Sequence, residues 1–453
     1  MRLRDALKIQ RGDVVAFIGA GGKTSALLRL AHELRAEGWR VLATTTTRVA
    51  RWEAEQAPLA ACMTSDIKPA TVRQWLNKHG FVFLYGGDQV NQSKVSGLSP
   101  HLVPGLMDSI NSDVLLIEAD GARRLPFKAP HDHEPVIPPD TSLVVPVAGL
   151  DALGQPLDDE HIYNANRILE RYGFPEGDPL IPPWMAVTLR DPELGLRNVP
   201  DGARVVPLLN KVPANGYGRR LARRVARIVL NSPRIEAVAL GSMQAPGDHP
   251  VHELQQRIAA VVLAAGTSSR MGQSKALLPW DSRTVIETIV NRLLTARLAE
   301  TLVVTGFQAD AIERRLAHLP VQTLYNPVYA EGEMLSSLQA ALRVLPETIA
   351  ACLVVMGDQP SLDSRVINQI VTAYLEGRGS IIAPVYRGER GHPILIDRRF
   401  WPELLALESG APRDVLRRYP DEVTLVEVGT DSILRDIDTP EEYRRERRRA
   451  GLR

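Results

Sequence analysis

The chain has 453 residues and a formal net charge of +1, with 54 Lys and Arg against 53 Asp and Glu. This length exceeds what one hydrophobic core supports, so two or three domains are expected. The balanced charge excludes a global field that would recruit nucleic acid or a membrane. Two cysteines, and no run near the roughly 20 apolar residues that span a bilayer, predict a soluble cytoplasmic protein without disulfides.

Short apolar runs alternate with helical patterns along the first 240 residues. VVAFI at 14–18 precedes a helix whose apolar face is Leu27, Leu30, Ala31 and Leu34. Further strands are expected at VLATT, VLLIE, LVVPVAG, VVPLLN and VAL. Such alternation predicts an α/β fold, in which helices cover both faces of a parallel sheet and ligands bind at the carboxyl ends of strands.

The second half repeats this pattern without repeating a motif. VVLAAG, TLVVTG, CLVVMGD and SIIAPV are the expected strands, and helical patterns separate them. Between the halves, the polar segment GSMQAPGDHPVHELQQR contains two prolines and is typical of a linker. We therefore expect two doubly wound α/β domains, 1–243 and 257–453, joined by a linker at 244–256.

GAGGKT stands between the first expected strand and the first helix. Gly19, Gly21 and Gly22 would let backbone amides turn toward a phosphate, Lys23 would neutralise charge, and Thr24 would reach Mg²⁺. The glycine that opens the usual P-loop is missing, and the shorter G-x-x-G-K-T spacing resembles the loop of Mur-ligase-type ATPases. We expect ATP or GTP here; the alternative is a glycine turn without a ligand.

Other polar groups in this half also follow expected strands. Glu118 and Asp120 lie at the end of the strand expected in VLLIEADG, where a carboxylate could hold the metal or its waters. The hydroxyls of 44–47 (TTTT) could reach phosphate or metal, and 208–211 (LLNK) is similar to the base-reading Asn-Lys pair of GTPases without the following Asp. The segment 128–138 is either a metal site or a polar loop. Its candidate ligands are His131, Asp132, His133 and Glu134.

The motifs GAGGKT, TTTT, EADG, KAPHDHEPVIP, AGLDALGQPL and LNK occur in that order. Over about residues 10–240 they resemble the YqeC-type accessory proteins of selenium-dependent molybdenum hydroxylases. The resemblance implies a P-loop-like, nucleotide-binding maturation factor. Its implied partner is a molybdenum hydroxylase client of the xanthine-dehydrogenase type, which would receive the cofactor.

In the second half, an apolar run ends in the Gly- and Ser-rich loop of VVLAAGTSSRMGQSK, and a second run ends in the Asp of VVMGDQP. The loop offers backbone amides and two cations, Arg270 and Lys275, for a nucleoside triphosphate. Asp358 is the expected metal ligand, because it follows a strand. Asp438 is the expected second ligand, with Asp436 as a competitor. The expected catalytic residues are Arg270, Lys275 and Asp358.

Further candidates surround this core. His392 in GHP either contacts the acceptor or stabilises a turn. Ser336 and Ser337 are either helix caps, which we favour, or acceptor contacts. The expected nucleotide contacts of this half are Leu263, Ala264, Ala265, Gly266, Ser269, Arg270 and Lys275.

Five motifs, LAAGTSSRMGQSKALLPW, NPVYAEGEMLSSLQAAL, MGDQP, RGHPILI and DIDTPEEY, occur in order over about residues 257–445. Together they resemble the MocA-like molybdenum cofactor cytidylyltransferases, within the larger MobA-like nucleotidyltransferase family. The resemblance implies a Rossmann-like (GT-A-like) domain that uses Mg²⁺, CTP and molybdopterin-bound molybdenum to form the cytosine dinucleotide cofactor and pyrophosphate. Within the family LAGG goes with guanylyl transfer and LAAG with cytidylyl transfer, so Ala265 indicates CTP.

Two alternatives remain open. The chain could be a maturation chaperone that binds nucleotide and a client hydroxylase without turnover, or a transferase that uses GTP or a sugar or polyol phosphate. The complete set of Arg270, Lys275 and Asp358 argues against the chaperone, because binding alone would not require it. GDQP and GHP favour the cofactor acceptor by resemblance.

Overall fold

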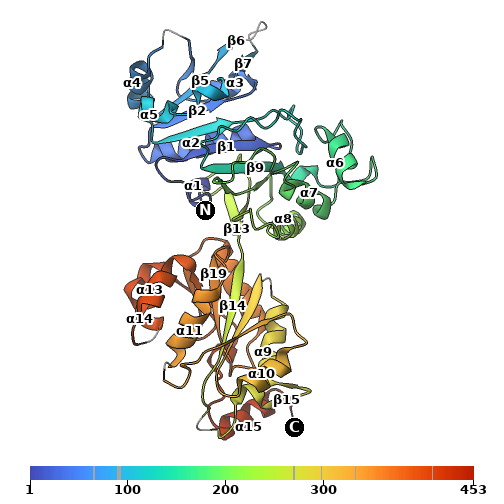
Figure 1. Cartoon of the computed structure of the whole chain (residues 1–453), viewed down its shortest axis with the longest axis vertical. Helices are drawn as coiled ribbons and strands as arrows, with labels where there is room; N and C mark the ends of the chain where they lie inside the picture. The colour runs from blue at the N-terminus through green and yellow to red at the C-terminus, as the bar shows by residue number, and fades with distance from the viewer. Residues whose placement is uncertain are drawn as a thin grey trace. The chain divides into compact units, whose positions relative to one another are not determined.

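The computed structural model describes residues 1–64, 67–88, 93–268, 271–296, 298–331, 333–410 and 412–452. The chain divides into two compact units, Met1–Gln255 and Gln256–Arg453, which run from blue to green and from yellow-green to red in Figure 1. Among the residues described, no helix combines the length and the hydrophobicity that crossing a lipid bilayer requires.

The N-terminal unit is built on a sheet of ten strands among the described residues, in the order β13-β12-β11-β9-β1-β8-β2-β5-β4, with β10 beside β9. Its pairings are parallel except β12 with β13. A small separate sheet contains β3 (Val49–Ala50), β7 (Lys94–Ser96) and β6 (Gly87–Asp88). The strands of the large sheet are β1 (Val14–Gly19), β2 (Val41–Thr45), β4 (Ala60–Cys62), β5 (Phe81–Tyr85), β8 (Val114–Glu118), β9 (Leu143–Gly149), β10 (Arg204–Val205), β11 (Leu208–Asn210), β12 (Val238–Gly241) and β13 (Val251–Gln255).

Helices cover both faces of this sheet, because successive side chains of each strand point to opposite sides. In β1, Val15 and Phe17 pack against α1 and α2, whereas Val14, Ala16 and Ile18 belong to the core on the other face. That second face is covered by α4 and α5 and, beside β9, β11 and β12, by α6, α7 and α8. The helices are α1 (Leu3–Ala6), α2 (Lys23–Ala36), α3 (Arg51–Ala54), α4 (Pro69–His79), α5 (Leu106–Ile110), α6 (Ala165–Tyr172), α7 (Pro182–Arg190) and α8 (Gly216–Val229).

The C-terminal unit has an eight-stranded sheet among the described residues, in the order β18-β17-β14-β19-β22-β20-β21, with β23 beside β20. The pairings of β14 with β17 and β19 are parallel, and β22 is antiparallel to both of its neighbours. A short hairpin of β15 (Pro279–Trp280) and β16 (Arg283–Thr284) stands apart. The strands are β14 (Ile258–Ala264), β17 (Glu300–Thr305), β18 (Gln322–Tyr325), β19 (Ala351–Met356), β20 (Ile381–Tyr386), β21 (Glu389–Arg390), β22 (Ile394–Asp397) and β23 (Val423–Glu427).

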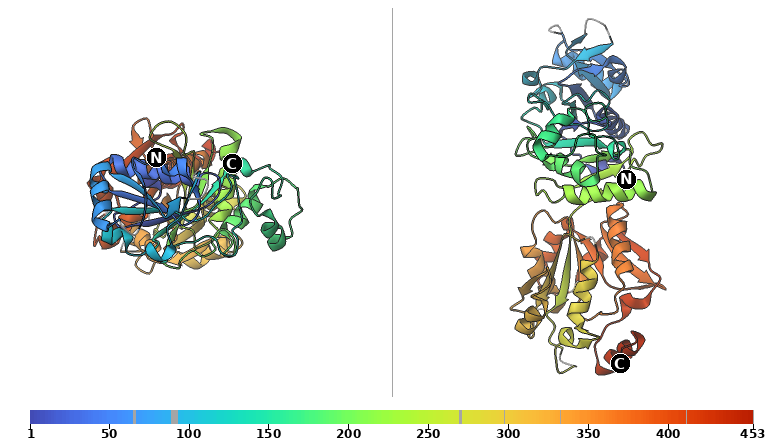
Figure 2. Two further views of the ribbon diagram at one scale, coloured as in Figure 1. Left: turned by 90° about the horizontal axis from the view of Figure 1, so that it is seen from above. Right: turned by 90° about the vertical axis from the view of Figure 1, so that its right-hand side faces the viewer.

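The central strand of this sheet, β14, is buried on both faces. Ala260 and Val262 pack toward α9, α10 and α12, whereas Ala259 and Val261 pack toward α11, α13 and α14. Figure 1 shows α9 and α11 on opposite sides of β14, and the right-hand view of Figure 2 shows the strands of this sheet between helices. The helices are α9 (Val285–Leu294), α10 (Ala309–Leu316), α11 (Glu333–Val344), α12 (Ser364–Leu375), α13 (Trp401–Ala406), α14 (Pro412–Arg418) and α15 (Pro440–Arg449).

Two features differ from the sequence-based expectation. Both sheets are mixed rather than parallel. In the N-terminal sheet, β13 is antiparallel to β12. In the C-terminal sheet, β21 follows β20 after only Arg387 and Gly388, and a connection this short allows only antiparallel pairing. In addition, the expected linker 244–256 is partly a strand. Residues 251–255 form β13, whose Val251 is 1% exposed, so the unit boundary lies after Gln255.

Candidate functional site

A cleft of about 400 Å³ opens in the C-terminal unit where β14 and β19 end. Carboxyl ends of parallel strands are the usual ligand-binding edge of an α/β sheet. Both strands contribute their last residues and the loops that follow, and α11 supplies one wall. The lining residues are Leu263, Ala264, Ala265, Gly266, Thr267, Ser268, Ser274, Lys275, Ala276, Tyr329, Ala330, Met334, Ser337, Met356, Gly357, Asp358 and Asp438.

One cation and two carboxylates meet in this cleft. The ammonium group of Lys275 lies 3.1 Å from Oδ2 of Asp358 and also forms an ion pair with Asp438. Burial opposes the charge on Lys275, but the two carboxylates outweigh it and raise its pKa. Burial raises the pKa of Asp358, and Lys275 opposes that rise. The structure thus brings together three residues separated by up to 163 positions in the chain.

Asp358 is placed by a close approach of two strands. A Cβ atom on the preceding Gly357 would lie 2.7 Å from the carbonyl oxygen of Leu263 and 3.0 Å from Cα of Ala264, so only glycine fits here. The backbone N–H of Ile437 donates to the carbonyl oxygen of Asp358 at 3.1 Å. This bond ties the segment that carries Asp438 to the end of β19.

Asp438 is placed by the start of α15. Thr439 is the N-cap residue, and its hydroxyl accepts a hydrogen bond from the N–H of Glu442. In return, Glu442 accepts bonds from the N–H groups of Asp438 and Thr439, each at 2.9 Å. Asp436 does not line the cleft; it accepts a hydrogen bond from Gln359 at 2.5 Å. Of the two candidates for the second carboxylate, Asp438 therefore faces the cleft.

The carboxylates of the cleft fit a divalent cation. Oδ1 of Asp358 is buried and has no hydrogen-bond partner among the described residues, which leaves a lone pair directed at no protein donor. Oxygen atoms of this kind are the ligands that Mg²⁺ takes, usually with only one or two carboxylates and with substrate phosphates completing the shell. No group of three or more His, Cys, Asp or Glu residues suited to a metal occurs among the described residues.

The other candidates of this unit are placed differently. Ser336 and Ser337 are not helix caps, because α11 begins at Glu333. Asn326 donates to both of their hydroxyl groups at 3.0 Å, and Ser337 also lines the cleft. His392 is half-buried, burial lowers its pKa, and it lies outside the cleft. Ser269 and Arg270 lie outside the described residues.

A second wall of the cleft was not predicted from the sequence. Tyr329, Ala330 and Met334 line it from the segment NPVYAEGEM. The signal was present, because this segment is one of the five motifs. The three side chains that line the cleft carry no charge, so none of them suggested a role in nucleotide transfer.

In the N-terminal unit, the glycine turn joins β1 to α2. Gly19, Gly21 and Gly22 have φ angles of 90°, 81° and 120°, in the region that only glycine adopts readily. A Cβ atom on Gly21 would lie 2.2 Å from the backbone nitrogen of Gly149, and one on Gly22 would lie 2.3 Å from Nδ2 of Asn210. Both the dihedral angles and the packing therefore require the glycines of GAGGKT.

Two side chains of the motif contact carboxylates at the end of β8. The hydroxyl of Thr24 donates to Oε2 of Glu118 at 2.7 Å, and burial raises the pKa of Glu118. Nζ of Lys23 donates to the carbonyl oxygen of Gly19 at 2.7 Å and lies 3.2 Å from Oδ1 of Asp120. The adjacent oxygens of Thr24 and Glu118 fit the coordination that Mg²⁺ takes beside a nucleotide phosphate.

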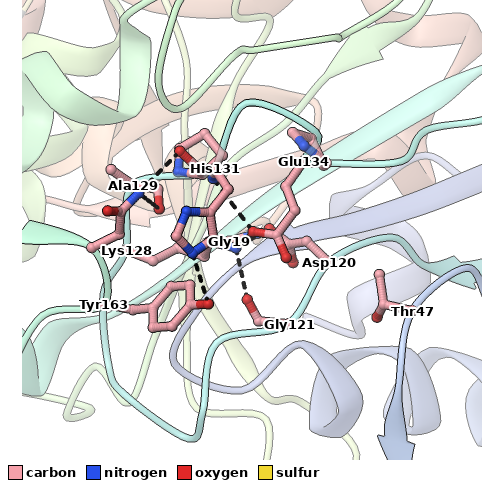
Figure 3. A network of polar contacts seen from close by, with 12 residues as sticks. Gly19, Thr47, Asp120, Gly121, Lys128, Ala129, His131, Glu134 and Tyr163 are labelled. Atoms are coloured by element: carbon pink, nitrogen blue, oxygen red, sulfur yellow. Dashed lines mark hydrogen bonds and ion pairs between the residues drawn. The ribbon is translucent and has the colours of Figure 1, made fainter. Parts of the chain in front are cut away.

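Asp120 belongs to a buried network behind the turn (Figure 3). Its Oδ2 accepts a hydrogen bond from the N–H of Gly19 at 2.9 Å and lies 3.1 Å from Nζ of Lys128. Lys128 also donates to Glu134 at 2.8 Å and to the carbonyl oxygen of Gly121 at 2.7 Å. These charged groups are almost fully buried and pair with one another. Asp120 therefore braces the turn, whereas Glu118 lines the open pocket.

The remaining candidates contact protein groups. Thr44 and Thr45, which are buried on β2, donate their hydroxyls to the carbonyl oxygens of Leu84 and Glu118. The half-buried Thr46, which follows β2, donates to the carbonyl oxygen of Val136. Residues 131–134 form a polar loop. His131 forms a hydrogen bond with Tyr163 at 3.1 Å, as Figure 3 shows, and Asp132 forms an ion pair with Arg167 at 2.8 Å.

Asn210 of the LLNK segment supports the glycine turn. Its Nδ2 donates to the carbonyl oxygen of Gly21 at 2.8 Å, and its Oδ1 accepts the N–H of Met243 at 3.0 Å. The side chain is 3% exposed, and both of its polar ends are used. Asn210 is therefore not free to recognise a nucleobase, unlike the Asn of the GTPase pair. Lys211 forms an ion pair with Asp151.

The glycine turn opens into a pocket of about 660 Å³ within the N-terminal unit. Segments that follow β1, β2, β8, β11 and β12 surround it, so it lies along the carboxyl edge of the sheet. The lining residues are Gly21, Gly22, Lys23, Thr24, Ser25, Arg48, Val49, Ala50, Glu53, Lys94, Glu118, Gly121, Ala122, Arg123, Arg124, Leu125, Tyr163, Asn210, Lys211, Ser242 and Gln244.

Comparison with known proteins assigns a family to each unit. Residues 15–166 match the family model of the YqeC protein, and residues 260–423 match that of the MobA-like NTP transferase domain. The first match includes the glycine turn, and the second includes the ends of β14 and β19 but not Asp438.

Three relatives illustrate these matches. The uncharacterized protein YqeC of Escherichia coli is 32% identical over 245 residues, which are 53% of this chain and 90% of that protein. The molybdenum cofactor cytidylyltransferase of the same organism is 30% identical over 187 residues, 41% of this chain and 93% of that protein. The nicotine blue oxidoreductase of Paenarthrobacter nicotinovorans is 31% identical over 198 residues, 42% of this chain and 95% of that protein. The relatives of the second unit thus carry two different activities.

Proposed function

The chain belongs to the YqeC family through its N-terminal half and to the MobA-like NTP transferase family through its C-terminal half, and we propose that it is a molybdenum cofactor cytidylyltransferase fused to a nucleotide-binding maturation domain. In this proposal the C-terminal unit transfers CMP from CTP to molybdopterin-bound molybdenum cofactor. The products are the cytosine dinucleotide form of the cofactor and pyrophosphate.

The observation that carries the proposal is the group formed by Lys275, Asp358 and Asp438 in the 400 Å³ cleft. The two carboxylates suit a metal ion, and the ammonium group suits phosphate oxygens. Together they fit a metal-bound triphosphate, whose negative charge requires a cation on more than one side. The buried Oδ1 of Asp358, without a donor among the described residues, supports a metal ligand at that atom. Asp358 and Asp438 would hold Mg²⁺, and that ion would neutralise charge on the phosphates.

The proposed chemistry requires positioning more than proton transfer. The acceptor is a phosphate monoester, which is already anionic, so its oxygen can attack the α-phosphorus in line without a general base while pyrophosphate leaves. As the triphosphate binds, the ammonium group of Lys275 would exchange its two carboxylate partners for phosphate oxygens. Backbone N–H groups of residues 265–268 would contact the phosphates from the loop.

CTP is the proposed nucleotide on the strength of the LAAG sequence at the end of β14. Ala265 lines the cleft and is 4% exposed, and it also belongs to the core cluster between β14 and α11. A methyl group at such a place can limit the size of the base that fits. His392 lies outside the cleft, and we therefore assign it no contact with the acceptor.

For the N-terminal unit we propose nucleotide binding at the glycine turn, with Lys23 as the phosphate contact and with Thr24 and Glu118 at the Mg²⁺. The hydrogen bond between Thr24 and Glu118 supports this pairing, because both oxygens then face one side of the pocket. ATP or GTP would supply energy for delivering the finished cofactor to a molybdenum hydroxylase client. The role in maturation rests on the resemblance of the motifs of this half to the YqeC-type accessory proteins.

The test is an incubation of the full chain with molybdopterin cofactor, Mg²⁺ and each of the four nucleoside triphosphates in turn, followed by identification of the product by mass. We expect the cytosine dinucleotide and pyrophosphate with CTP. A guanine product would move the base assignment to GTP. No nucleotide product with this acceptor, but turnover with a sugar or polyol phosphate, would favour the second alternative. Nucleotide binding without any turnover would favour the maturation chaperone.

A further inference from the structure

The pocket of the N-terminal unit has a cationic wall that the proposed nucleotide contacts do not use. Arg48 follows β2, Lys94 begins β7, and Arg123 and Arg124 lie in the loop after β8. All four line the same 660 Å³ pocket as Lys23 and are exposed to it and to solvent. They come from three separate segments, so their convergence is a property of the fold.

These four side chains have no carboxylate partner in the part of the chain that the structure describes. Less exposed cations of this unit have such partners, for example Arg40 with Asp113 at 3.0 Å and Lys128 with Glu134 at 2.8 Å. Cations that line one pocket repel one another. An arrangement of this kind is stabilised by an anion that binds among the four groups.

The arginines are held in place by aromatic rings rather than by acids. Arg123 lies over the ring of Tyr163, with its guanidinium carbon 5.4 Å from the ring centroid, and Arg124 lies over Trp52 at 5.8 Å. Both have positive φ angles, 46° and 65°, which non-glycine residues rarely adopt. Two consecutive non-glycine residues in this conformation strain the backbone, and such strain is concentrated at functional sites.

The wall lies on one side of the glycine turn only. In the sheet, β1 stands between β9 and β8; Asn210, Lys211, Ser242 and Gln244 follow strands on the β9 side. Arg48, Arg123 and Arg124 follow strands on the β8 side. The side of β9 offers the neutral side chains of Ser242 and Gln244 and one lysine already paired with Asp151, which suits a nucleoside. The side of β8 offers positive charge that has no carboxylate partner among the described residues, although Glu53 and Glu118 line the same pocket.

We propose that the N-terminal unit has a second subsite, formed by Arg48, Lys94, Arg123 and Arg124, for a small molecule that carries a phosphate group. Its ligand would lie across the glycine turn from the nucleoside and would face the terminal phosphate of the nucleotide. Arginine pairs bind phosphate oxygens in a forked geometry, which favours a phosphate over a carboxylate of the same charge. The subsite uses none of the proposed nucleotide contacts, so phosphate binding at the subsite can be tested separately from nucleotide binding at the glycine turn.

The test measures binding of inorganic phosphate to the full chain by titration calorimetry at constant ionic strength. Mg²⁺ and non-hydrolysable analogues of ATP and CTP are present at saturation, so that the triphosphate positions of both units are filled. We expect phosphate still to bind, and the double variant R123Q/R124Q to raise its Kd at least tenfold. R220Q is the matched control, because Arg220 also lies over an aromatic ring, Tyr217 at 5.6 Å, but away from the pocket. Its Kd should equal that of the wild type.

Three results would overturn the proposal. They are no phosphate binding by the wild type, an unchanged Kd in R123Q/R124Q, or binding that disappears when the analogues are added, which would mean that the cations serve the triphosphate itself. If R123Q/R124Q fails to fold by circular dichroism, R48Q/K94Q tests the same wall from other segments and should also raise the Kd. Binding of the ATP analogue, compared between wild type and K23A, tests the nucleotide site independently.

Discussion

Nδ2 of Asn210 donates a hydrogen bond to the carbonyl oxygen of Gly21 at 2.8 Å and so fixes the glycine turn from a strand two places away in the sheet. The same side chain accepts the N–H of Met243, which joins the segment after β12 to the turn. Three loops at the carboxyl edge of the N-terminal sheet are thus held by one buried amide. The shape of the turn therefore depends on residues far from GAGGKT in the chain.

Replacing Asn210 by Ala should lower both stability and nucleotide affinity. The variant leaves a buried carbonyl oxygen and a buried N–H without partners, at a cost of about 1–3 kcal/mol. Hydrogen exchange should rise in peptides that cover residues 19–24, and the affinity of the N-terminal unit for an ATP analogue should fall. N231A is the control, because Asn231 is exposed at the end of α8. Equal exchange in the two variants would contradict this role of Asn210.

Replacing Asp358 by Asn should abolish cytidylyl transfer while leaving the fold intact. The amide is nearly isosteric but supplies one weak ligand oxygen instead of a carboxylate, so Mg²⁺ and triphosphate both bind less well. We expect kcat/KM to fall at least about a hundredfold at saturating Mg²⁺. D436N is the matched control, since Asp436 contacts Gln359 outside the cleft. A larger loss in D436N than in D358N would assign the metal to Asp436.

Replacing Ala265 by Gly should relax the choice of base. If the methyl group of Ala265 limits the space beside the loop, its removal admits the larger guanine. One methyl group is worth about 1–3 kcal/mol of discrimination, so the ratio of kcat/KM for CTP to that for GTP should fall about tenfold or more. A264G serves as the control at the neighbouring cleft position. An unchanged ratio in A265G would place the determinant of specificity elsewhere.

The elements that could be predicted from the sequence are those with local signals. Apolar runs gave β1, β8, β14 and β19, and the residues after them gave Thr24, Glu118, Lys275 and Asp358 as candidates. These residues need no knowledge of distant partners, because every parallel strand ends at the same edge.

The elements that could not be predicted depend on distant partners. Asn210 contacts Gly21 across 189 positions, so its role as a brace has no local signal. β13 reads as a polar linker because Glu253 interrupts its apolar pattern, yet this carboxylate is 1% exposed and pairs with Arg219 and Arg223 of α8. Burial of a charge with its partners hides a strand from any analysis of hydrophobic pattern.

Replacing Asp113 by Asn should destabilise the N-terminal unit in a pH-dependent way. Burial opposes the charge on Asp113, but hydrogen bonds from Arg40 and the nearby Arg11 outweigh it and lower the pKa of Asp113 from 3.8 to about 2. Because the pKa is lower in the folded state, this stabilisation is complete above about pH 4 and is lost as pH falls toward 2. The apparent melting temperature of D113N should lie below that of the wild type at pH 7.

The gap between the two melting temperatures should narrow progressively from pH 4 downward, because the wild type loses the same contribution by protonation. D108N is the control, since Asp108 is exposed on α5 and should show no gap at either pH. A gap for D113N that stays constant down to pH 2.5 would mean that packing, and not the charge of Asp113, carries its contribution.

The two units should be separable, but only if the division follows β13. Fragment 256–453 begins just before β14 and should fold and transfer cytidylyl groups alone. Fragment 1–255 should fold and bind nucleotide through Lys23. Fragment 1–243, which the polar segment suggested as the domain, should melt at a lower temperature or aggregate, because it loses β13 and exposes β12 as an open edge.

The strand that this shorter fragment lacks is bound in three ways. β13 pairs with β12, its Val251 accepts a hydrogen bond from the N-terminal amino group at 2.7 Å, and its Glu253 neutralises Arg219 and Arg223. Removing Glu253 leaves two arginines of α8 without this carboxylate, and removing Val251 uncovers part of the core. Melting temperatures of fragments 1–243 and 1–255, measured side by side, decide the point. Equal values would show that β13 adds nothing, and a 256–453 fragment that is folded but inactive until 1–255 is added back would show that the two sites are coupled.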